Sequence, residues 1–359
     1  MHYGLTMECD YRYGTTAVDA FDEAFDQMQA AEDWGLDGVW LAERHFAAPR
    51  AELDLQGTGI PSVVSAPLII ATAIAARTER IKVGVAVNVL PLAHPVRMAE
   101  EIATLDHISQ GRLDFGIGRS TFAFIYEGFG MDFSESRGRF DECLEIILKG
   151  WTEDQFSYAG DFYKFDNSCV VPKPYQQPHP PISVGVTSAE TFPMVGRMGY
   201  PILINPSRVF SLAELKDYIG EYQKARKEAG HEGKGQVGLR VPVYLAETAE
   251  AAYEEPRPST EEAMGRLGEI IASTAHGVGV TDDRLAQADR IRAMNYDDWL
   301  RDKVVYGTPE AAVDRFRELQ EELGLTEIIY EVNFGCQIPH ERQVNTVRLL
   351  TEQVAPQLN

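Results

Sequence analysis

The stretch "IKVGVAVNVLPLAHPVRMAEEIATLDHISQGRLDFGIGRS", residues 81–120, contains one complete strand–helix–strand unit. Residues 81–90 and 113–120 are apolar runs rich in β-branched side chains, which is typical of buried strands. The segment between them has apolar residues at helical spacing and begins with Pro95, a residue favoured in first turns. Two buried strands joined by a helix predict a parallel sheet covered on both faces.

The same unit recurs along the chain. Apolar segments that predict strands lie at residues 2–9, 38–46, 81–90, 113–120, 181–186, 201–206, 237–247 and 327–335. Helical spacing predicts helices at 18–34, 67–77, 95–108, 136–150, 212–230 and 309–323. Eight such units fit a closed barrel or a long doubly wound sheet, and the strand count favours the barrel. We therefore predict one α/β domain over residues 1–359, folded as a (βα)8 TIM barrel.

Two stretches interrupt this alternation. Residues 151–181 predict a small hairpin and a proline-rich connector, inserted before the fifth strand. Residues 254–308, between the seventh and eighth strands, are longer and polar. Because long loops in compact folds are usually functional, we predict that this second insertion is a lid.

Composition limits the classes of partner. Asp and Glu number 55 against 33 Lys and Arg, and the formal charge of −22 argues against nucleic acid and anionic membranes as partners. The N-terminus lacks the pattern of a secretory signal and no apolar run is long enough to span a bilayer, so we expect a cytoplasmic protein. The four cysteines are far apart and form no CxxC pair, which indicates neither a metal site nor a disulfide framework.

Polar side chains gather where the predicted strands end, and the active site of a TIM barrel lies at that rim. Each residue alone could simply meet solvent, but their convergence indicates a site. The rim set is Glu8, Glu43, Arg44, His45, Asn88, Arg119, Ser120, Thr187, Ser188, Asn205, Glu331 and Asn333. Thr6 shares a strand face with Glu8, and both are predicted to line the substrate pocket. Phe122 could wall that pocket or pack in the core, and His276 of the predicted lid could approach substrate on closure.

Arg119 and the segment "VTSAET", residues 186–191, together predict an anion site. Arg119 follows a glycine-bearing strand, so a ligand can approach the backbone closely. A helix beginning near Ala189 would offer free N–H groups to a phosphate, although Ser188 could instead only cap that helix. The sequence contains no GxGxxG and no P-loop motif, so the usual nucleotide cradles are missing.

Four stretches resemble the bacterial luciferase-like, flavin-dependent monooxygenases: "GLDGVWLAERHF", residues 81–120, "PPISVGVTSAET" and "VYGTPEAAVDRFREL". The resemblance covers essentially the whole chain. It implies a barrel that binds reduced FMN at its C-terminal mouth, with the flavin supplied by a separate NAD(P)H-dependent reductase. A flavin C4a-(hydro)peroxide would then oxygenate a small, largely apolar substrate, by aldehyde or ketone oxidation, hydroxylation or N-oxidation. A homodimer is also expected from the resemblance.

The resemblance also implies which residues hold FMN. Its phosphate would lie against Arg119, Thr187, Ser188 and Thr191. A non-proline cis peptide between Ala86 and Val87 would lie beneath the isoalloxazine ring. The cofactor site that we assign on this basis comprises Ala86, Val87, Asn88, Arg119, Ser120, Val186, Thr187, Ser188 and Thr191.

Two departures from luciferase bear on the chemistry. Arg44 replaces the first of two histidines, and Gly118 replaces a reactive cysteine, so we expect oxygenation without light emission. Arg44 stays protonated, whereas His45 titrates near neutrality and is the candidate for proton transfer. Glu43 would fix the tautomer of His45 or pair with Arg44. Alternatively, Glu43 and Arg44 form a structural ion pair in the barrel wall and only one of Arg44 and His45 faces inward.

Two other functional classes remain open. Relatives of this family use a reduced deazaflavin for hydride transfer without oxygen, and others bind flavin without known turnover. A flavin C4a-peroxide absorbance that persists after the protein is mixed with reduced FMN and air would distinguish a monooxygenase from both of these classes.

Overall fold

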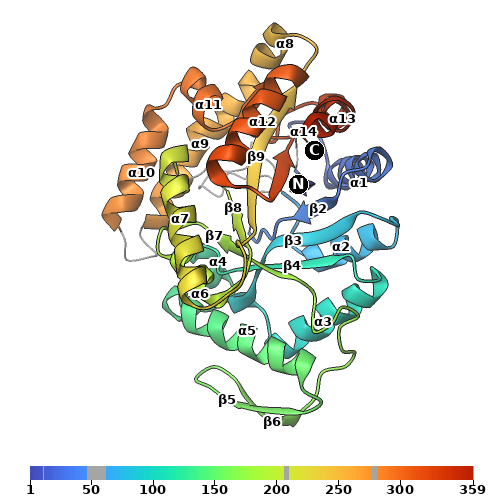
Figure 1. Ribbon diagram of the computed structural model, residues 1–359, viewed down its shortest axis with the longest axis vertical. Coiled ribbons are helices and arrows are strands. Elements are labelled where there is room, and N and C mark those ends of the chain that lie inside the picture. The colour runs from blue at the N-terminus through green and yellow to red at the C-terminus, as the bar shows by residue number, and fades with distance from the viewer. Residues whose placement is uncertain (11, 47–61, 206–209, 276–280, 359) are drawn as a thin grey trace.

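A computed structural model describes residues 1–10, 12–46, 62–205, 210–275 and 281–358. Eight parallel strands close into a barrel in the order β1-β2-β3-β4-β7-β8-β9-β11, with β11 paired to β1 (Figure 1). The strands are β1 His2–Met7, β2 Gly38–Leu41, β3 Lys82–Val89, β4 Leu113–Gly118, β7 Ile182–Val186, β8 Ile202–Ile204, β9 Val237–Leu245 and β11 Glu327–Glu331. The predicted (βα)8 TIM barrel is confirmed, and each predicted strand is present.

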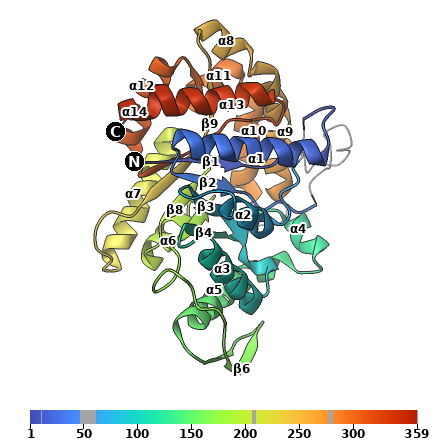
Figure 2. The ribbon, with the colours of Figure 1, turned by 90° about the vertical axis from the view of Figure 1, so that its right-hand side faces the viewer.

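Helices surround the barrel, as predicted from their spacing. The helices outside the large insertion are α1 Ala17–Trp34, α2 Pro67–Ala75, α3 Pro95–Ile108, α4 Ala123–Gly128, α5 Ser136–Thr152, α6 Thr191–Met198, α7 Leu212–Glu228, α8 Ala249–Glu254, α12 Pro309–Leu323, α13 His340–Leu349 and α14 Ala355–Leu358. Local chemistry fixes several ends: Thr16 begins α1 with a capping box, and Gly35 ends it with a φ of 91° that suits glycine. Helices α1 and α13 lie side by side (Figure 2), joined by a 2.6 Å hydrogen bond from Gln27 to Gln343.

The lower half of the barrel is filled by one large side chain. Trp40 of β2 packs between strands that carry glycine opposite it, and a Cβ built on Gly84 would lie 2.4 Å from the indole ring. The indole Nε1 donates a 2.8 Å hydrogen bond to Glu327 at the start of β11. On the side of the C-terminal strand ends, Trp40 contacts Leu203 and Ile329, and both of these residues line the cavity of the candidate site. Trp40 therefore separates that cavity from the N-terminal end of the barrel.

The two insertions differ in character. The predicted hairpin is confirmed as antiparallel β5 (Phe156–Ala159) and β6 (Lys164–Ser168), which project below the barrel in Figure 1. The second insertion consists of helices rather than a loop: α9 (Arg257–Ala275), α10 (Thr281–Ala293) and α11 (Tyr296–Asp302). A short strand, β10 (Val305–Gly307), follows them and pairs with β9.

The second insertion has a small hydrophobic core of its own, centred on Trp299, which stacks on Phe334 at 5.5 Å. It is attached to loops at the C-terminal ends of two strands, through the Lys303 hydrogen bond to the Phe210 carbonyl and the Arg266 bond to the Gly335 carbonyl. Its role as a lid stays a prediction. In the described part of the chain, no helix is long and apolar enough to span a membrane.

Candidate functional site

A cavity opens at the C-terminal ends of the barrel strands, where the sequence predicted the site. All eight barrel strands, or the turns that follow them, contribute lining residues. Aromatic and aliphatic side chains from the segment after β4 form much of its wall, among them Phe122, Phe124, Ile125 and Phe133. Of the predicted substrate-pocket residues, Thr6 and Phe122 line the cavity, Glu8 does not, and His276 lies outside the described residues.

The floor on the β3 side contains the Ala86–Val87 peptide bond, which is cis as the family resemblance implied. Gly118 and Gly185 make room for Val87, because a Cβ on either glycine would lie 2.4 or 2.7 Å from a methyl group of Val87. This geometry leaves no space for a side chain at position 118, because Val87 already occupies it. Asn88 faces away from the cavity, buried, and donates a 2.9 Å hydrogen bond to the Gly116 carbonyl. Asn88 therefore does not line the cavity, and its assignment to the cofactor site stays a prediction.

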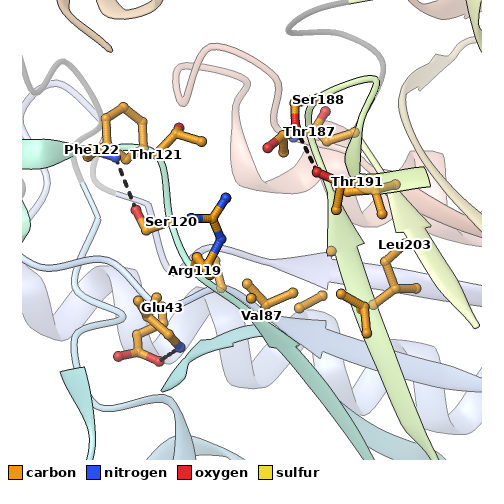
Figure 3. Close-up of a pocket in the computed structure, with 18 of the residues that line it drawn as sticks. Glu43, Val87, Arg119, Ser120, Thr121, Phe122, Thr187, Ser188, Thr191 and Leu203 are labelled. Atoms are coloured by element: carbon orange, nitrogen blue, oxygen red, sulfur yellow. Dashed lines mark hydrogen bonds between the residues drawn. The ribbon is translucent and has the colours of Figure 1, made fainter. Parts of the chain in front are cut away.

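Arg119 lies between the turn of Ser120 to Phe122 and the hydroxyl side chains of Thr187, Ser188 and Thr191 (Figure 3). Its side chain makes one weak hydrogen bond, 3.3 Å from Nη1 to the Ser136 hydroxyl, and no ion pair with a carboxylate among the described residues. Burial, followed by the positive charge of nearby Arg137, lowers the pKa of the Arg119 guanidinium. The negative charges of Glu190 and Asp141 act on Arg119 as well, but neither forms an ion pair with it in the described part of the chain, so the half-buried cation can favour an anionic ligand.

The hydroxyl groups of the predicted anion site lie at and before the start of α6. The Ser188 hydroxyl bonds to the side chains of Thr191 at 2.6 Å and Glu190 at 2.7 Å, and it makes no capping bond to the helix backbone. The alternative in which Ser188 only caps α6 is therefore wrong. Ser120 has a left-handed φ of 59° and lines the cavity together with Val186. The cation, the hydroxyls and the N-terminus of α6 suit a phosphate group.

Glu43 and His45 form a fixed pair on the β2 side of the cavity. Strand β2 ends at Leu41, so residues 42–45 follow the strand, and both Arg44 and His45 line the cavity. His45 Nε2 lies 2.8 Å from Glu43 Oε1, while Glu43 Oε2 accepts a 2.8 Å bond from the Val89 N–H. The His45 ring also meets Phe129 edge to face, with 4.9 Å between ring centres. The predicted contact of Glu43 with His45 is present.

Arg44 pairs with Glu8 and not with Glu43, so of the two alternatives the Glu43–Arg44 ion pair is wrong. Its Nε and Nη2 donate to the two oxygens of Glu8 at 2.9 and 2.8 Å. Arg240, in the middle of β9, donates to Glu8 at 2.5 Å and holds Glu331 through a salt bridge of 2.6 Å. Glu8 lies behind these guanidinium groups and is 6% exposed, which explains why it does not line the cavity. The sequence analysis missed Arg240, although a charge within the apolar run "VGLRVPVYL" was a usable signal.

Comparisons with known proteins agree with this geometry. The sequence model of the "Luciferase-like monooxygenase" family matches residues 3–327. The alkanal monooxygenase alpha chain of the Kryptophanaron alfredi symbiont is 35% identical over 204 residues, which cover 57% of this chain and 53% of that protein. The chain thus spans about half the length of such curated relatives.

Two solved structures share the fold over the whole chain. Monooxygenase RslO1 from Streptomyces bottropensis superposes with a TM-score of 0.81 at 25% identity, covering 100% of both chains. The oxygenating constituent of 3,6-diketocamphane monooxygenase from Pseudomonas putida, solved in complex with FMN, gives 0.80 at 21% identity and covers 100% and 99% of the two chains. With the family match over most of its length, the chain belongs to the luciferase-like monooxygenases.

Proposed function

We propose that this protein is an FMN-dependent monooxygenase that uses reduced FMN and molecular oxygen to oxygenate a small, largely apolar organic substrate. The observation that carries the proposal is Arg119, a cavity-facing cation without a carboxylate partner in the described residues, set opposite three hydroxyl side chains. The flavin dependence of family relatives supports it. The substrate and the type of oxygenation belong to the proposal.

The site residues divide into two groups towards FMN. Arg119, Thr187, Ser188 and Thr191 would hold the phosphate through charge-assisted hydrogen bonds. Ala86 and Val87, with Ser120 and Val186 beside them, would support the ring system on an apolar floor. Both groups line one cavity, so a single elongated ligand can contact both.

Reduced FMN, when bound, activates oxygen, delivers one oxygen atom to the substrate and releases the other as water. We assign the movement of a proton in this reaction to His45, and its position in the cavity wall supports the assignment. A Glu43 carboxylate can only accept, so the contact of its Oε1 with Nε2 favours the tautomer of His45 with the proton on Nε2, in which Nδ1 would be the nitrogen that accepts a proton. Arg44 stays protonated and can only donate hydrogen bonds.

The wall of the cavity indicates the substrate class. Phe124, Ile125 and Phe133 present apolar surface, which matches a hydrocarbon-rich compound better than a sugar phosphate. We include in the proposal a homodimer and a separate NAD(P)H-dependent reductase that supplies reduced FMN by diffusion.

Anaerobic titration with reduced FMN tests the cofactor assignment. Arg119→Met should weaken the binding of reduced FMN by about tenfold or more, because one charge-assisted contact contributes roughly 1.5–3 kcal/mol. The exposed Arg97→Met on α3 is the matched control and should bind as the wild type does. Equal affinities of the wild type and Arg119→Met would remove Arg119 from the phosphate site.

Admission of air then tests the chemistry. A monooxygenase changes the rate at which reduced FMN reoxidises and, with a substrate library and a reductase held behind a dialysis membrane, yields products that contain one oxygen atom from ¹⁸O₂. Reoxidation at the rate of free flavin would refute oxygenation. Binding of a reduced deazaflavin in preference to reduced FMN would favour hydride transfer.

A further inference from the structure

Three side chains at the start of α6 form a chain of hydrogen bonds that ends on a carboxylate. The Ser188 hydroxyl donates to Glu190 Oε1 at 2.7 Å and lies 2.6 Å from the Thr191 hydroxyl. An ionised carboxylate only accepts hydrogen bonds, so the single hydroxyl hydrogen of Ser188 is directed at Glu190, and Thr191 is the donor to Ser188. Two of the hydroxyl hydrogens assigned to the flavin phosphate are therefore directed along this chain towards Glu190.

Glu190 also belongs to the surroundings of Arg119. Both residues line the cavity, and the negative charge of Glu190 acts on the Arg119 guanidinium, although the two form no ion pair in the described part of the chain. Arg119 lies on one side of this space, with the hydroxyl groups of Ser188 and Thr191 on the other (Figure 3). An anionic ligand that binds between them would therefore use the cation and the hydroxyl groups with which Glu190 already interacts.

A phosphate monoester in this site would meet both an attractive and a repulsive charge. Such a group carries roughly −1.5 to −2 charges at neutral pH, so Arg119 attracts it and Glu190 repels it. Glu190 also competes with it for the hydroxyl hydrogen of Ser188. Because Glu190 is exposed, solvent screens the repulsion, and the carboxylate weakens the binding of a phosphate without preventing it.

We propose that Glu190 limits the affinity of this site for the phosphate of FMN, so that the bound flavin stays exchangeable. This inference rests on the proposed function and adds to it a residue that opposes cofactor binding. Exchange is required when a separate reductase supplies the flavin, because oxidised FMN has to leave the cavity before reduced FMN can enter. A weaker phosphate contact raises the rate at which oxidised FMN dissociates, since differences in affinity appear mainly in that rate.

Riboflavin separates an effect on the phosphate from an effect on the rest of the flavin. It has the ring system and the ribityl chain of FMN but lacks the phosphate group. Fluorescence titration of the full-length protein with oxidised FMN and with oxidised riboflavin gives the dissociation constant of each. Rapid mixing of the FMN complex with an excess of apoflavodoxin, which captures free FMN, gives the dissociation rate. No turnover is involved, so binding is measured separately from activity.

Glu190→Gln should tighten the binding of FMN by about fivefold and slow its dissociation, because the amide removes the charge and still accepts a hydrogen bond from Ser188. The dissociation constant of riboflavin should stay as in the wild type. The gain for FMN should shrink in about 1 M salt, which screens an exposed charge. Glu322→Gln on the exposed side of α12 is the matched control for the loss of one surface charge and should change neither ligand.

Three results overturn the inference. Equal FMN affinities of the wild type and Glu190→Gln would mean that the carboxylate does not oppose the phosphate. Weaker FMN binding by Glu190→Gln would mean that Glu190 supports it. Equal changes for FMN and riboflavin would place Glu190 against the ribityl chain or the ring. Failure of the proposed function is distinguishable, because Arg119→Met would then bind FMN as the wild type does, whereas failure of this inference alone leaves the loss in Arg119→Met intact.

Discussion

Glu327 makes the stability of this barrel dependent on pH in a direction that can be worked out from its surroundings. Its carboxyl group lies at the N-terminal end of the barrel and accepts the Trp40 indole hydrogen bond at 2.8 Å. Burial, opposed by this hydrogen bond and reinforced by the negative charge of Asp114, raises the pKa of Glu327 from 4.5 to about 7. Lys82 and Asp37 are the other charged groups near it.

The sign of the effect follows from which state keeps the proton. Between pH 4.5 and about 7 the folded protein holds a proton on Glu327 that the unfolded chain releases. The contribution of Glu327 to the free energy of unfolding is therefore highest below pH 4.5, falls as pH rises, and levels off above about 7. Each unit of pKa shift corresponds to about 1.4 kcal/mol, so the contribution of Glu327 to the free energy of unfolding changes by at most roughly 3 kcal/mol across this pH range. Because Glu327 is only half-buried, we expect about 2 kcal/mol between pH 5 and pH 8.

Glu327→Gln tests this reasoning, because the amide keeps an oxygen acceptor for Trp40 and removes the titration. Urea unfolding followed by circular dichroism at pH 5 and pH 8 gives the free energy of unfolding of both proteins. The advantage of the variant over the wild type should grow by about 2 kcal/mol from pH 5 to pH 8. Glu322→Gln, on the exposed side of α12, should show no such growth. Parallel pH profiles of wild type and Glu327→Gln would refute the argument.

Three further predictions concern the insertion and the cavity. Burial lowers the pKa of Lys303 to about 8, so its contribution to the free energy of unfolding should rise between pH 8 and 10.5. Lys303→Met also loses the hydrogen bond to the Phe210 carbonyl, so the test is the change with pH: by urea unfolding, the stability of the variant relative to the wild type should fall by about 2 kcal/mol from pH 7 to pH 10. Gly118→Ala brings a Cβ within 2.4 Å of a Val87 methyl group and should weaken the binding of reduced FMN by about tenfold. Gly220→Ala is the control, because a Cβ at position 220 would have no atom within 4 Å; this variant should bind reduced FMN normally, and its free energy of unfolding should rise by about 1 kcal/mol. His45→Ala should lower the single-turnover rate of product formation by about 100-fold with little change in FMN affinity, and an equal loss of both would make His45 structural.

The parts of the fold that local chemistry determines were predictable. The barrel strands are rich in apolar and β-branched residues because both of their faces are buried, and this composition can be recognised without knowledge of the tertiary contacts. Helix ends such as Thr16 and Gly35 were visible because capping depends on neighbours within one turn. The helices of the second insertion were missed because their outer faces are polar, and the small core around Trp299 forms only when three helices come together.

The pairing of charges in the site was not predictable, since it depends on strands far apart in sequence. Glu43, Arg44 and His45 are consecutive, and adjacency suggested a Glu43–Arg44 pair. The closure of the barrel instead brings Glu8, 36 residues away, beneath Arg44, and brings Arg240 to the same carboxylate from 232 residues away.

That choice of partner determines what the neighbouring residues can do. If Glu43 bound Arg44, His45 would have no carboxylate to fix its tautomer. Because Glu8 binds Arg44, Glu43 is available to His45, and its second oxygen is anchored by the Val89 N–H. His45 and Arg44 are thus adjacent in the chain, but each contacts a different carboxylate. Arg240 supports this arrangement, because it forms salt bridges with both Glu8 and Glu331 and so helps to hold the carboxylate that binds Arg44. Replacement of Arg240 by Met should therefore disturb the site through Glu8 and Arg44, even though its own nitrogens are all committed to carboxylates.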